Sequence, residues 1–356
     1  MDKEVIFHTY RENADMDTFR NKRERATRAD VARLANVSTA VVSYVFNNGP
    51  RNVAPETAER VRDAAQKLNY RPNSMAKALR TGSSKTIGII VPDLSNPFFS
   101  DVYNALENIA TSRGYSAMFV ASHQNPEREM DGVSKLIARD VDAILIASAQ
   151  PTSALASVPR KECPFVFLDQ TQAIPGAKCV STDFRAAVQT AVQHLIDHGR
   201  TNIAMLSGKA DEGLGDKRIQ GWYQAFDNST LPIGPIKQAH FTRAGGYEAM
   251  MALLNSGKQL DAIFVDSDLE AIGALRALHE RQVRVPEDIA IVSFDGTIDS
   301  QYTWPSLTVV QQNAQTIGTC LFHAAIDSEN TPDLQLVRAS LIPRESCGCL
   351  TSTVYA

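Results

Sequence analysis

The chain has 356 residues, of which 44% are hydrophobic, and a formal net charge of −4. A chain of this length normally divides into two or three domains. No run approaches the roughly 18–20 consecutive apolar residues of a membrane-spanning helix, and the N-terminus lacks the apolar segment of a secretory signal. These features exclude an integral membrane protein and predict a cytoplasmic one, whose five cysteines are reduced.

Residues 1–25 show no hydrophobic periodicity and predict a variable, disordered extension. Met16 is a second candidate for the start of translation besides Met1. The sequence leaves both starts open.

Residues 28–47 predict two short helices separated by a tight turn. Thr27 is a suitable N-cap for the first helix, and apolar residues recur at helical spacing up to Ala35. On the second helix, which Ser38 caps, a valine-rich face turns inward and four residues remain outside: Thr39, Ala40, Ser43 and Tyr44. A short helix with small polar groups fits the DNA major groove. A helical hairpin that packs on another surface is the alternative.

Charge is concentrated around this helical pair. Residues 20–85 carry 14 Lys and Arg against 5 Asp and Glu, a balance of +9, in a chain whose total is −4, so the remainder carries −13. A basic segment attached to an acidic remainder is typical of a protein that binds a polyanion through one part only. The charge therefore favours double-stranded DNA as the partner.

A third helix and a short linker are expected next. Residues 47–50 form a strong turn signal, and Pro55 begins a helix to about Asn69, which completes a three-helix domain over residues 26–72. Residues 74–80 give a seven-residue helical run, which is too short to be stable alone in water. Residues 73–85 are therefore predicted to be a linker that contains one short, marginally stable helix.

From residue 86 onward, short apolar strands alternate with amphipathic helices. The expected strands are 87–91, 116–121, 143–147, 165–168, 203–207, 236–241, 262–266 and 289–294. The expected helices are 98–113, 126–139, 152–160, 183–198, 216–228, 244–255 and 268–281. This alternation predicts an α/β fold with parallel sheets covered on both faces. Ligands bind such sheets beyond the carboxyl ends of the strands.

Candidate ligand-binding side chains follow several of these strands. Asp169 and Asp295 each end a predicted strand, and Arg218 lies at the start of a helix, where its guanidinium could bind a hydroxyl pair or a carboxylate. The loop after the first strand offers a polar group, an aromatic face and an apolar side chain: Asn96, Phe98 and Val102. This mixture suits a sugar. The alternative is that the carboxylates only cap helices or turns.

No catalytic or metal motif is present. The chain has no G-x-S-x-G, H-E-x-x-H or Walker sequence, which argues against an enzyme and against a bound cofactor. Cys347 and Cys349 offer two thiolates, but no histidine or further cysteine shows metal-ligand spacing beside them, so no metal is predicted. A transport binding protein is an alternative class. Such a protein would carry a signal peptide and would lack the basic N-terminal segment.

The order of motifs resembles the LacI/GalR (lac repressor/galactose repressor) family of bacterial transcriptional regulators. The resemblance lies in D-V-A-R-L-A-N-V-S, V-S-Y-V-F-N-N, V-A-P-E-T-A-E-R-V, L-N-Y-R-P-N-S-M-A-K-A-L-R-T-G and I-G-I-I-V-P-D-L-S-N-P-F-F, and it covers about residues 26–346. It implies a two-lobed effector-binding and dimerisation domain over residues 86–346. The first lobe would comprise about 86–182 and 314–330, and the second about 183–312 and 334–346. The tail, residues 347–356, lacks heptads, so a coiled-coil tetramer is not expected.

The resemblance also assigns roles to residues. Thr39, Ala40 and Tyr44 would read base edges, and a second set would contact phosphate: Arg28, Ser38, Ser43 and Asn47. Tyr44 departs from the arginine that many members carry, so a different operator half-site is expected. In the hinge helix, Leu79 would be the wedge in the minor groove, with Ser74 and Ala78 beside it. Relatives line the effector cleft at positions matching Thr182, Phe241, Ser267, Asp268 and Gln312.

The function implied is a repressor that binds a near-palindromic operator as a homodimer and responds to a small-molecule effector. Arg218 is the only arginine near the second-lobe loop at residues 211–218. This argues against a carboxylated or purine effector and favours a neutral mono- or oligosaccharide. The alternative is a global carbon-control regulator whose DNA binding is strengthened by a partner protein. The sequence does not show whether the effector induces or co-represses.

Overall fold

The computed structural model describes residues 26–47, 52–72, 78, 81–93, 95–148, 150, 163–208, 214–227 and 229–349. The chain divides into two compact units, residues 1–77 and 78–356, and each is described by itself. Within the described residues no helix has the length and apolar character needed to cross a membrane.

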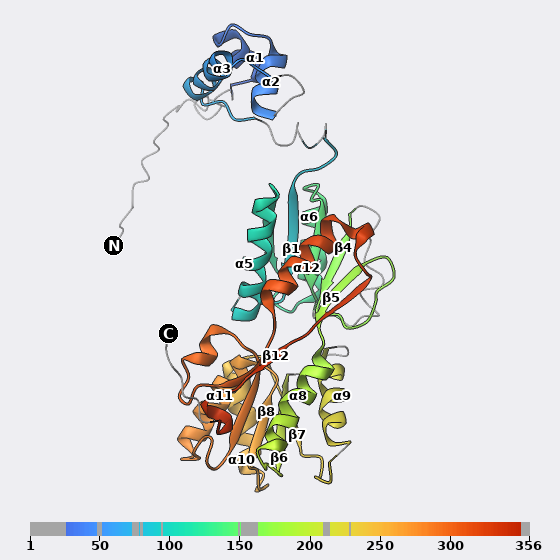
Figure 1. Ribbon diagram of the computed structural model, residues 1–356, viewed down its shortest axis with the longest axis vertical. Helices are drawn as coiled ribbons and strands as arrows, with labels where there is room; N and C mark the ends of the chain where they lie inside the picture. The colour runs from blue at the N-terminus through green and yellow to red at the C-terminus, as the bar shows by residue number, and fades with distance from the viewer. Residues whose placement is uncertain are drawn as a thin grey trace, which may run out of the picture. The chain divides into compact units, whose positions relative to one another are not determined.

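Three helices form the N-terminal unit: α1 (Arg28–Leu34), α2 (Thr39–Asn47) and α3 (Pro55–Lys67) (Figure 1). Thr27 and Asp30 form a capping box, in which the Thr27 hydroxyl accepts from the Asp30 amide at 3.3 Å and the Asp30 carboxylate accepts from the Thr27 amide at 2.9 Å. Asn36, with φ of 53°, makes the turn between α1 and α2. The small core contains Val31, Ala32, Ala35, Val42, Val61, Ala64 and Ala65.

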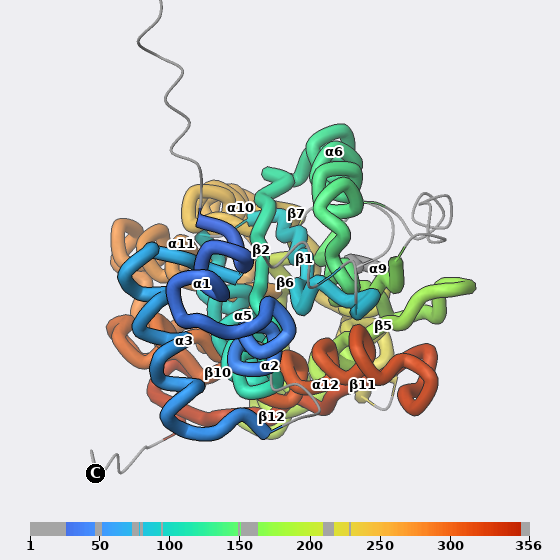
Figure 2. The backbone as a smooth tube through the Cα atoms, turned by 90° about the horizontal axis from the view of Figure 1, so that it is seen from above, coloured from blue at the N-terminus to red at the C-terminus, as the bar shows by residue number. Residues whose placement is uncertain are grey.

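The first lobe is a parallel sheet with strand order β11-β5-β4-β3-β1-β2. Its strands are β1 (Thr86–Val91), β2 (Ser116–Ala121), β3 (Ala143–Ala147), β4 (Phe165–Leu168), β5 (Lys178–Thr182) and β11 (Leu334–Val337). Helices α5 (Pro97–Ser112) and α12 (Ala314–Ile326) contribute to one core cluster of the sheet, and α6 (Pro126–Ile137) contributes to another. Figure 2 shows α6 and α12 on different sides of the sheet.

The second lobe is a sheet of order β12-β10-β9-β8-β6-β7, parallel except for β12. Its strands are β6 (Ile203–Gly208), β7 (Ile236–Ala239), β8 (Ala262–Val265), β9 (Ala290–Asp295), β10 (Thr308–Gln311) and β12 (Ser340–Ile342). Helices α8 (Phe184–Asp197) and α9 (Leu214–Phe226) cover one face. Helices α10 (Arg243–Asn255) and α11 (Asp268–Glu280) cover the other. These two helices pack closely because Gly273 brings its backbone against α10, where a Cβ atom would lie 1.9 Å from the Arg243 carbonyl oxygen.

The chain passes between the lobes three times, after β5, after β10 and after β11 (Figure 1). The predicted assignment of residues 334–346 to the second lobe is wrong in its first part. Leu334 pairs with Cys179, so β11 is an edge strand of the first sheet, and only β12 pairs with β10. One short segment, residues 334–342, therefore supplies a strand to each sheet, which periodicity alone cannot detect. The helix expected at 152–160 falls outside the described residues.

Candidate functional site

Arg218 is the centre of a buried polar cluster at the carboxyl ends of the second-lobe strands. It lies on α9 and is 7% exposed. Its guanidinium carbon lies 4.5 Å from the ring centroid of Phe184 and 4.7 Å from that of Phe294, which are cation–π distances. A guanidinium nitrogen lies 4.0 Å from Asp266, and Nε has no hydrogen-bond partner among the described residues. Part of the guanidinium is therefore held in place with a donor unused.

Four buried carboxyl groups surround this single guanidinium: Asp169, Asp266, Glu270 and Asp295. Burial raises the pKa of each, and the charge of Arg218 opposes the rise. The pKa of Asp169 reaches about 6, and those of Glu270 and Asp295 lie well above their ordinary values. Because four carboxyl groups share one guanidinium in a buried site, the protonated form of the carboxyl groups is favoured. Asp169 belongs to the first lobe and the other three to the second, so this is an interlobe cluster.

Gln312 connects the interlobe cluster to the segments that cross between the lobes. Its amide nitrogen donates to Asp295 at 2.8 Å, and its amide oxygen accepts from the Thr182 hydroxyl at 2.5 Å. Thr182 ends β5 and Gln312 follows β10, so this bond joins two of the three crossings. Asp295 has a φ of 101° and Asp169 a φ of 64°, left-handed values that non-glycine residues seldom adopt and that concentrate at functional sites.

Several predicted effector residues also make contacts within the protein. Asn96 caps α5, where its side-chain oxygen accepts from the Phe98 amide at 3.0 Å. Phe98 and Val102 are buried in the first-lobe core, and Ser267 caps α11. Asp268 accepts from the Ser293 hydroxyl and from the amide and hydroxyl of Thr297, so its oxygens are occupied. The structure does place Phe241 near the cluster, with its ring centroid 5.5 Å from the Arg218 guanidinium.

Three polar residues of the cluster were missed by the sequence analysis: Tyr103, Asp266 and Glu270. Each has a buried side-chain atom without a hydrogen-bond partner in the described part of the chain. Burial and the charge of Asp169 both raise the pKa of Tyr103, which places its hydroxyl near that carboxyl. Asp266 directly follows β8 and could have been found by the strand-end rule. Glu270 could not, because the first turn of a helix is an ordinary place for a glutamate.

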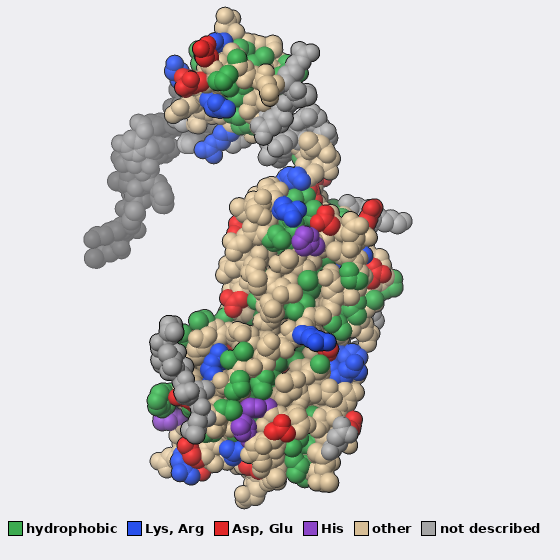
Figure 3. Space-filling model, viewed as in Figure 1, with side chains coloured by type: hydrophobic (Ala, Val, Ile, Leu, Met, Phe, Trp, Pro, Cys, Tyr) green, Lys and Arg blue, Asp and Glu red, His purple; other side chains and the backbone are tan. Residues whose placement is uncertain are grey.

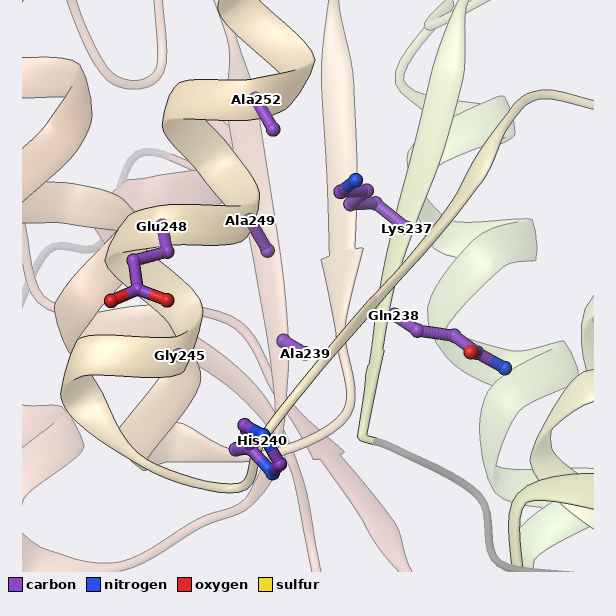
Figure 4. A pocket seen from close by; sticks show the side chains of 8 residues that line it. All are labelled: Lys237, Gln238, Ala239, His240, Gly245, Glu248, Ala249 and Ala252. Atoms are coloured by element: carbon purple, nitrogen blue, oxygen red, sulfur yellow. The ribbon is translucent and has the colours of Figure 1, made fainter.

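A separate hollow lies beside the edge strand β7. It is lined by residues of β7 and α10 and by His240, which follows β7. Figure 4 shows Lys237 on the strand and Glu248 on the helix. None of the residues that sequence analysis predicted for an effector lines it. The interlobe cluster is therefore the better candidate for a ligand.

The exposed side of the N-terminal unit carries the predicted DNA-contacting residues. Arg28, Ser38, Thr39 and Ala40 are exposed, Ser43 and Tyr44 are partly exposed, and Val42 on the opposite face is 1% exposed. The Ser38 hydroxyl accepts from the Val41 amide at 3.3 Å and caps α2. Lys and Arg side chains are present on this unit in Figure 3. Ala78 lies in a helical position, whereas Ser74, Leu79 and the side chain of Asn47 lie outside the described residues.

The prediction that Cys347 and Cys349 lack further ligands is wrong. Helix α8 brings His194 and His198 to them, and one ligand atom of each of the four residues lies within 4.8 Å of the others. The two histidines are about 150 residues away in sequence but are adjacent in the fold.

Raising the pH is expected to destabilise the protein through Asp169. Its pKa of about 6 in the folded protein, against an ordinary 3.8, means that the folded state binds this proton more tightly than the unfolded state. The stabilisation is complete below about pH 4 and is lost as the pH rises through about 6, with a total of about 3 kcal/mol. Asp169→Asn should flatten this part of a urea-unfolding profile against pH. The exposed Asp227→Asn serves as control, and an equally steep Asp169→Asn profile would contradict the assignment.

A two-lobed α/β unit with a polar cluster between its lobes, attached to a helix-turn-helix unit, defines a ligand-responsive DNA-binding regulator. Comparisons agree. Residues 27–73 match the profile of bacterial regulatory proteins of the lacI family, and residues 84–345 match that of periplasmic binding proteins and the sugar binding domain of the LacI family. The chain belongs to the LacI family and is a DNA-binding transcriptional regulator, not an enzyme.

Similar proteins include catabolite control protein A of Priestia megaterium, 35% identical over 81% of this chain and 88% of that protein. The transcriptional repressor PurR of Histophilus somni (strain 2336) is 31% identical over 82% and 89%. A crystal structure of the lac repressor dimer bound to operator and the anti-inducer ONPF has a TM-score of 0.82 and 27% identity, covering 91% of this chain and 99% of that one. A CelR–cellobiose complex has a TM-score of 0.68 at 27% identity, covering 90% and 100%.

Proposed function

We propose that the chain is a repressor that binds a near-palindromic operator as a homodimer and is switched by a neutral sugar in the interlobe cluster. In this proposal residues 26–72 read DNA, residues 73–85 form the hinge and residues 86–346 bind the effector. The similarity to the operator-bound lac repressor dimer supports the DNA-binding part. The interlobe cluster supports the effector part, and it is the observation that carries the proposal.

The chemistry of the cluster favours a ligand rich in hydroxyl groups. Among the residues that the structure describes, Asp169, Asp266 and Glu270 each have an acceptor oxygen without a partner, and Arg218 Nε and the Tyr103 hydroxyl also have none. An unpaired buried polar atom costs about 1–3 kcal/mol, which a ligand with matching groups recovers on binding. A sugar hydroxyl both donates and accepts, so one molecule can satisfy all of these atoms. An anionic ligand would lie beside four carboxyl groups, and only the Arg218 guanidinium would be there to neutralise its charge. The cluster therefore disfavours an anion.

The location of the cluster supplies a mechanism for switching. Asp169 comes from the first lobe and Arg218 from the second, and Gln312 connects the second-lobe residue Asp295 to Thr182 at a crossing. A ligand bound to both lobes stabilises one angle between them. Only a difference in affinity for the two arrangements can shift DNA binding, and a typical coupling is about 1–3 kcal/mol. We propose that this change orders or melts the two hinge helices of the dimer.

A thermal-shift screen tests the effector class. Purified full-length protein is heated with neutral mono- and oligosaccharides, sugar phosphates and purine bases, and a true ligand raises Tm by mass action. Hits are then added to a gel-shift assay with selected operator DNA. A neutral saccharide that stabilises the protein and changes operator affinity is the expected result. Stabilisation by purines or sugar phosphates alone would overturn the sugar assignment but not the DNA-binding one.

Catabolite control protein A, at 35% identity, favours a second candidate. This second candidate is a global carbon-control regulator, whose DNA binding is strengthened by a partner protein rather than changed by a sugar. The two candidates differ in a simple measurement: cell lysate freed of small molecules by dialysis should increase operator affinity only if a macromolecular partner is required.

Leu79→Ala is expected to weaken specific operator binding by several-fold or more without affecting binding of the effector. The reason is that the family wedges a leucine at this position into the minor groove, where the bend it produces allows further contacts. Operator affinity is measured by fluorescence anisotropy at fixed salt, with effector binding as the control for folding. Unchanged operator affinity would remove the hinge wedge from the proposal.

A further inference from the structure

Two histidines and two cysteines meet where the described end of the chain lies against helix α8. His194 is in the last turn of α8 and His198 is its C-cap, so the two are one helical turn apart on the same side. Cys347 ends a short 3-10 helix (Glu345–Cys347), and Cys349 follows two residues later. The proposed regulator function uses none of these four side chains.

The distances among the ligand atoms suit a tetrahedral metal ion. Cys349 Sγ lies 3.2 Å from His198 Nε2 and 3.8 Å from His194 Nε2, and all four ligand atoms lie within 4.8 Å of one another. In a tetrahedral zinc site, with bonds of about 2.3 Å to sulfur and about 2.0 Å to nitrogen, ligand atoms are about 3.3–3.8 Å apart. Small side-chain rotations would bring the remaining pairs into that range.

The surrounding residues hold the cysteines in place. Cys347 is 1% exposed, and its sulfur accepts a hydrogen bond from the Thr308 hydroxyl at 3.0 Å. The Ser346 hydroxyl donates to the Ile291 carbonyl at 2.7 Å and accepts from the Thr308 amide at 2.8 Å, which fixes the chain end on the sheet. Gly348 has a φ of 92°, a left-handed value that favours glycine and turns the chain between the two cysteines. Such outer contacts orient ligands in natural metal sites.

We propose that His194, His198, Cys347 and Cys349 form a structural Zn²⁺ site that fastens the segment 345–349 to helix α8 of the second lobe. Two thiolates and two imidazoles complete a closed tetrahedron, the arrangement of structural rather than catalytic zinc. On binding, the two thiols release their protons to solvent and the metal stays divalent. The site connects residues 155 positions apart in sequence, so it stabilises the fold of the second lobe independently of effector and operator.

Metal content and cobalt spectroscopy test the site. Full-length protein is purified under reducing conditions and stripped with a chelator. Separate samples of the stripped protein are titrated with Zn²⁺ and with Co²⁺. The visible absorption of bound Co²⁺ reports tetrahedral geometry, and its near-ultraviolet bands report thiolate ligation. We expect one equivalent of zinc, tetrahedral cobalt bands with thiolate charge transfer, and a higher Tm with metal than without it.

Matched variants separate ligation from general effects of substitution. Cys349→Ser and His198→Gln change side chains that are not fully buried, so the fold should survive, and each should weaken zinc binding by about 100-fold or more, since even outer-shell changes cost about 10–100-fold. Cys320→Ser and His279→Gln remove a cysteine and a histidine outside the cluster and should bind zinc like the unaltered protein. Zinc binding that is absent, that lacks thiolate bands, or that is equal in Cys349→Ser and Cys320→Ser would overturn the proposal.

Discussion

Arg218→Ala is expected to abolish the response to effector and to lower the free energy of unfolding by about 3–5 kcal/mol at neutral pH, the usual cost of removing one partner from a buried ion pair. The guanidinium is the cation that lowers the pKa of all four carboxyl groups of the interlobe cluster. Without it, any of these groups that ionises loses the positive charge that stabilises it. The ligand also loses the Nε donor, which has no partner among the described residues.

The pH dependence of this loss distinguishes electrostatics from packing. Because Arg218 lowers the pKa of the carboxyl groups in the folded state, its stabilising effect is largest at high pH and decreases as the pH falls and the carboxyl groups become protonated. Urea unfolding at pH 8 and at pH 5 should therefore show the larger difference at pH 8. A loss that is the same at both values would mean that Arg218 acts mainly by packing between Phe184 and Phe294.

Two further variants control this experiment. Arg218→Lys keeps the charge but loses the planar fork and its contacts with the aromatic rings, so it should retain more stability than Arg218→Ala and still lose the effector response. Arg276 forms an exposed pair with Glu280 at 2.7 Å, and Arg276→Ala should change stability by less than about 1 kcal/mol. DNA binding without effector should persist in all three variants. A normal effector response in Arg218→Ala would show that the ligand binds elsewhere.

The sequence allowed the elements of the fold to be predicted because their periodicity is local. The first four expected strands agree with β1 to β4 to within one residue, since each is a continuous apolar run bounded by turn residues. Strands β5 and β10 were not assigned, because a short segment with polar ends gives little signal. Strand β11 was placed in the wrong lobe because strand pairing depends on contacts that are distant in sequence.

From the residue pattern, the candidate site was predicted at strand ends and at Arg218, which lies near the start of a helix. Asp169 and Asp295 follow the strand-end rule and lie in the interlobe cluster. Asp268, two residues beyond Asp266, was also expected to bind the effector. Its oxygens accept hydrogen bonds from Ser293 and Thr297, whereas Asp266 Oδ1 has no partner among the described residues. The difference between the two aspartates depends on hydrogen-bond partners about 25 to 60 positions away, and no local pattern reports them. For the same reason, the sequence did not predict that His194 and His198 lie beside Cys347 and Cys349.

Tyr44→Arg is expected to change which operator the protein prefers. Ala40 and Tyr44 are four residues apart on α2 and share a face, where Ala40 is exposed and Tyr44 partly exposed. Tyrosine offers one hydroxyl and an apolar ring to a base edge, whereas arginine donates two hydrogen bonds to guanine. A bidentate contact is worth about 1–3 kcal/mol, so guanine at the contacted position should gain about 5-fold to 150-fold in relative affinity.

The measurement must separate specificity from added charge. An extra arginine also attracts phosphate and raises affinity for every sequence, so operator selection from a random library should be followed by competition between paired sites at one fixed salt concentration. The ratio of the two affinities removes the common electrostatic contribution. Tyr44→Phe keeps the ring and removes the hydroxyl, and it should lose discrimination without gaining the guanine preference. An unchanged preference in Tyr44→Arg would show that the side chain at position 44 does not reach the bases, and the docking of α2 in the major groove would have to be turned about its axis.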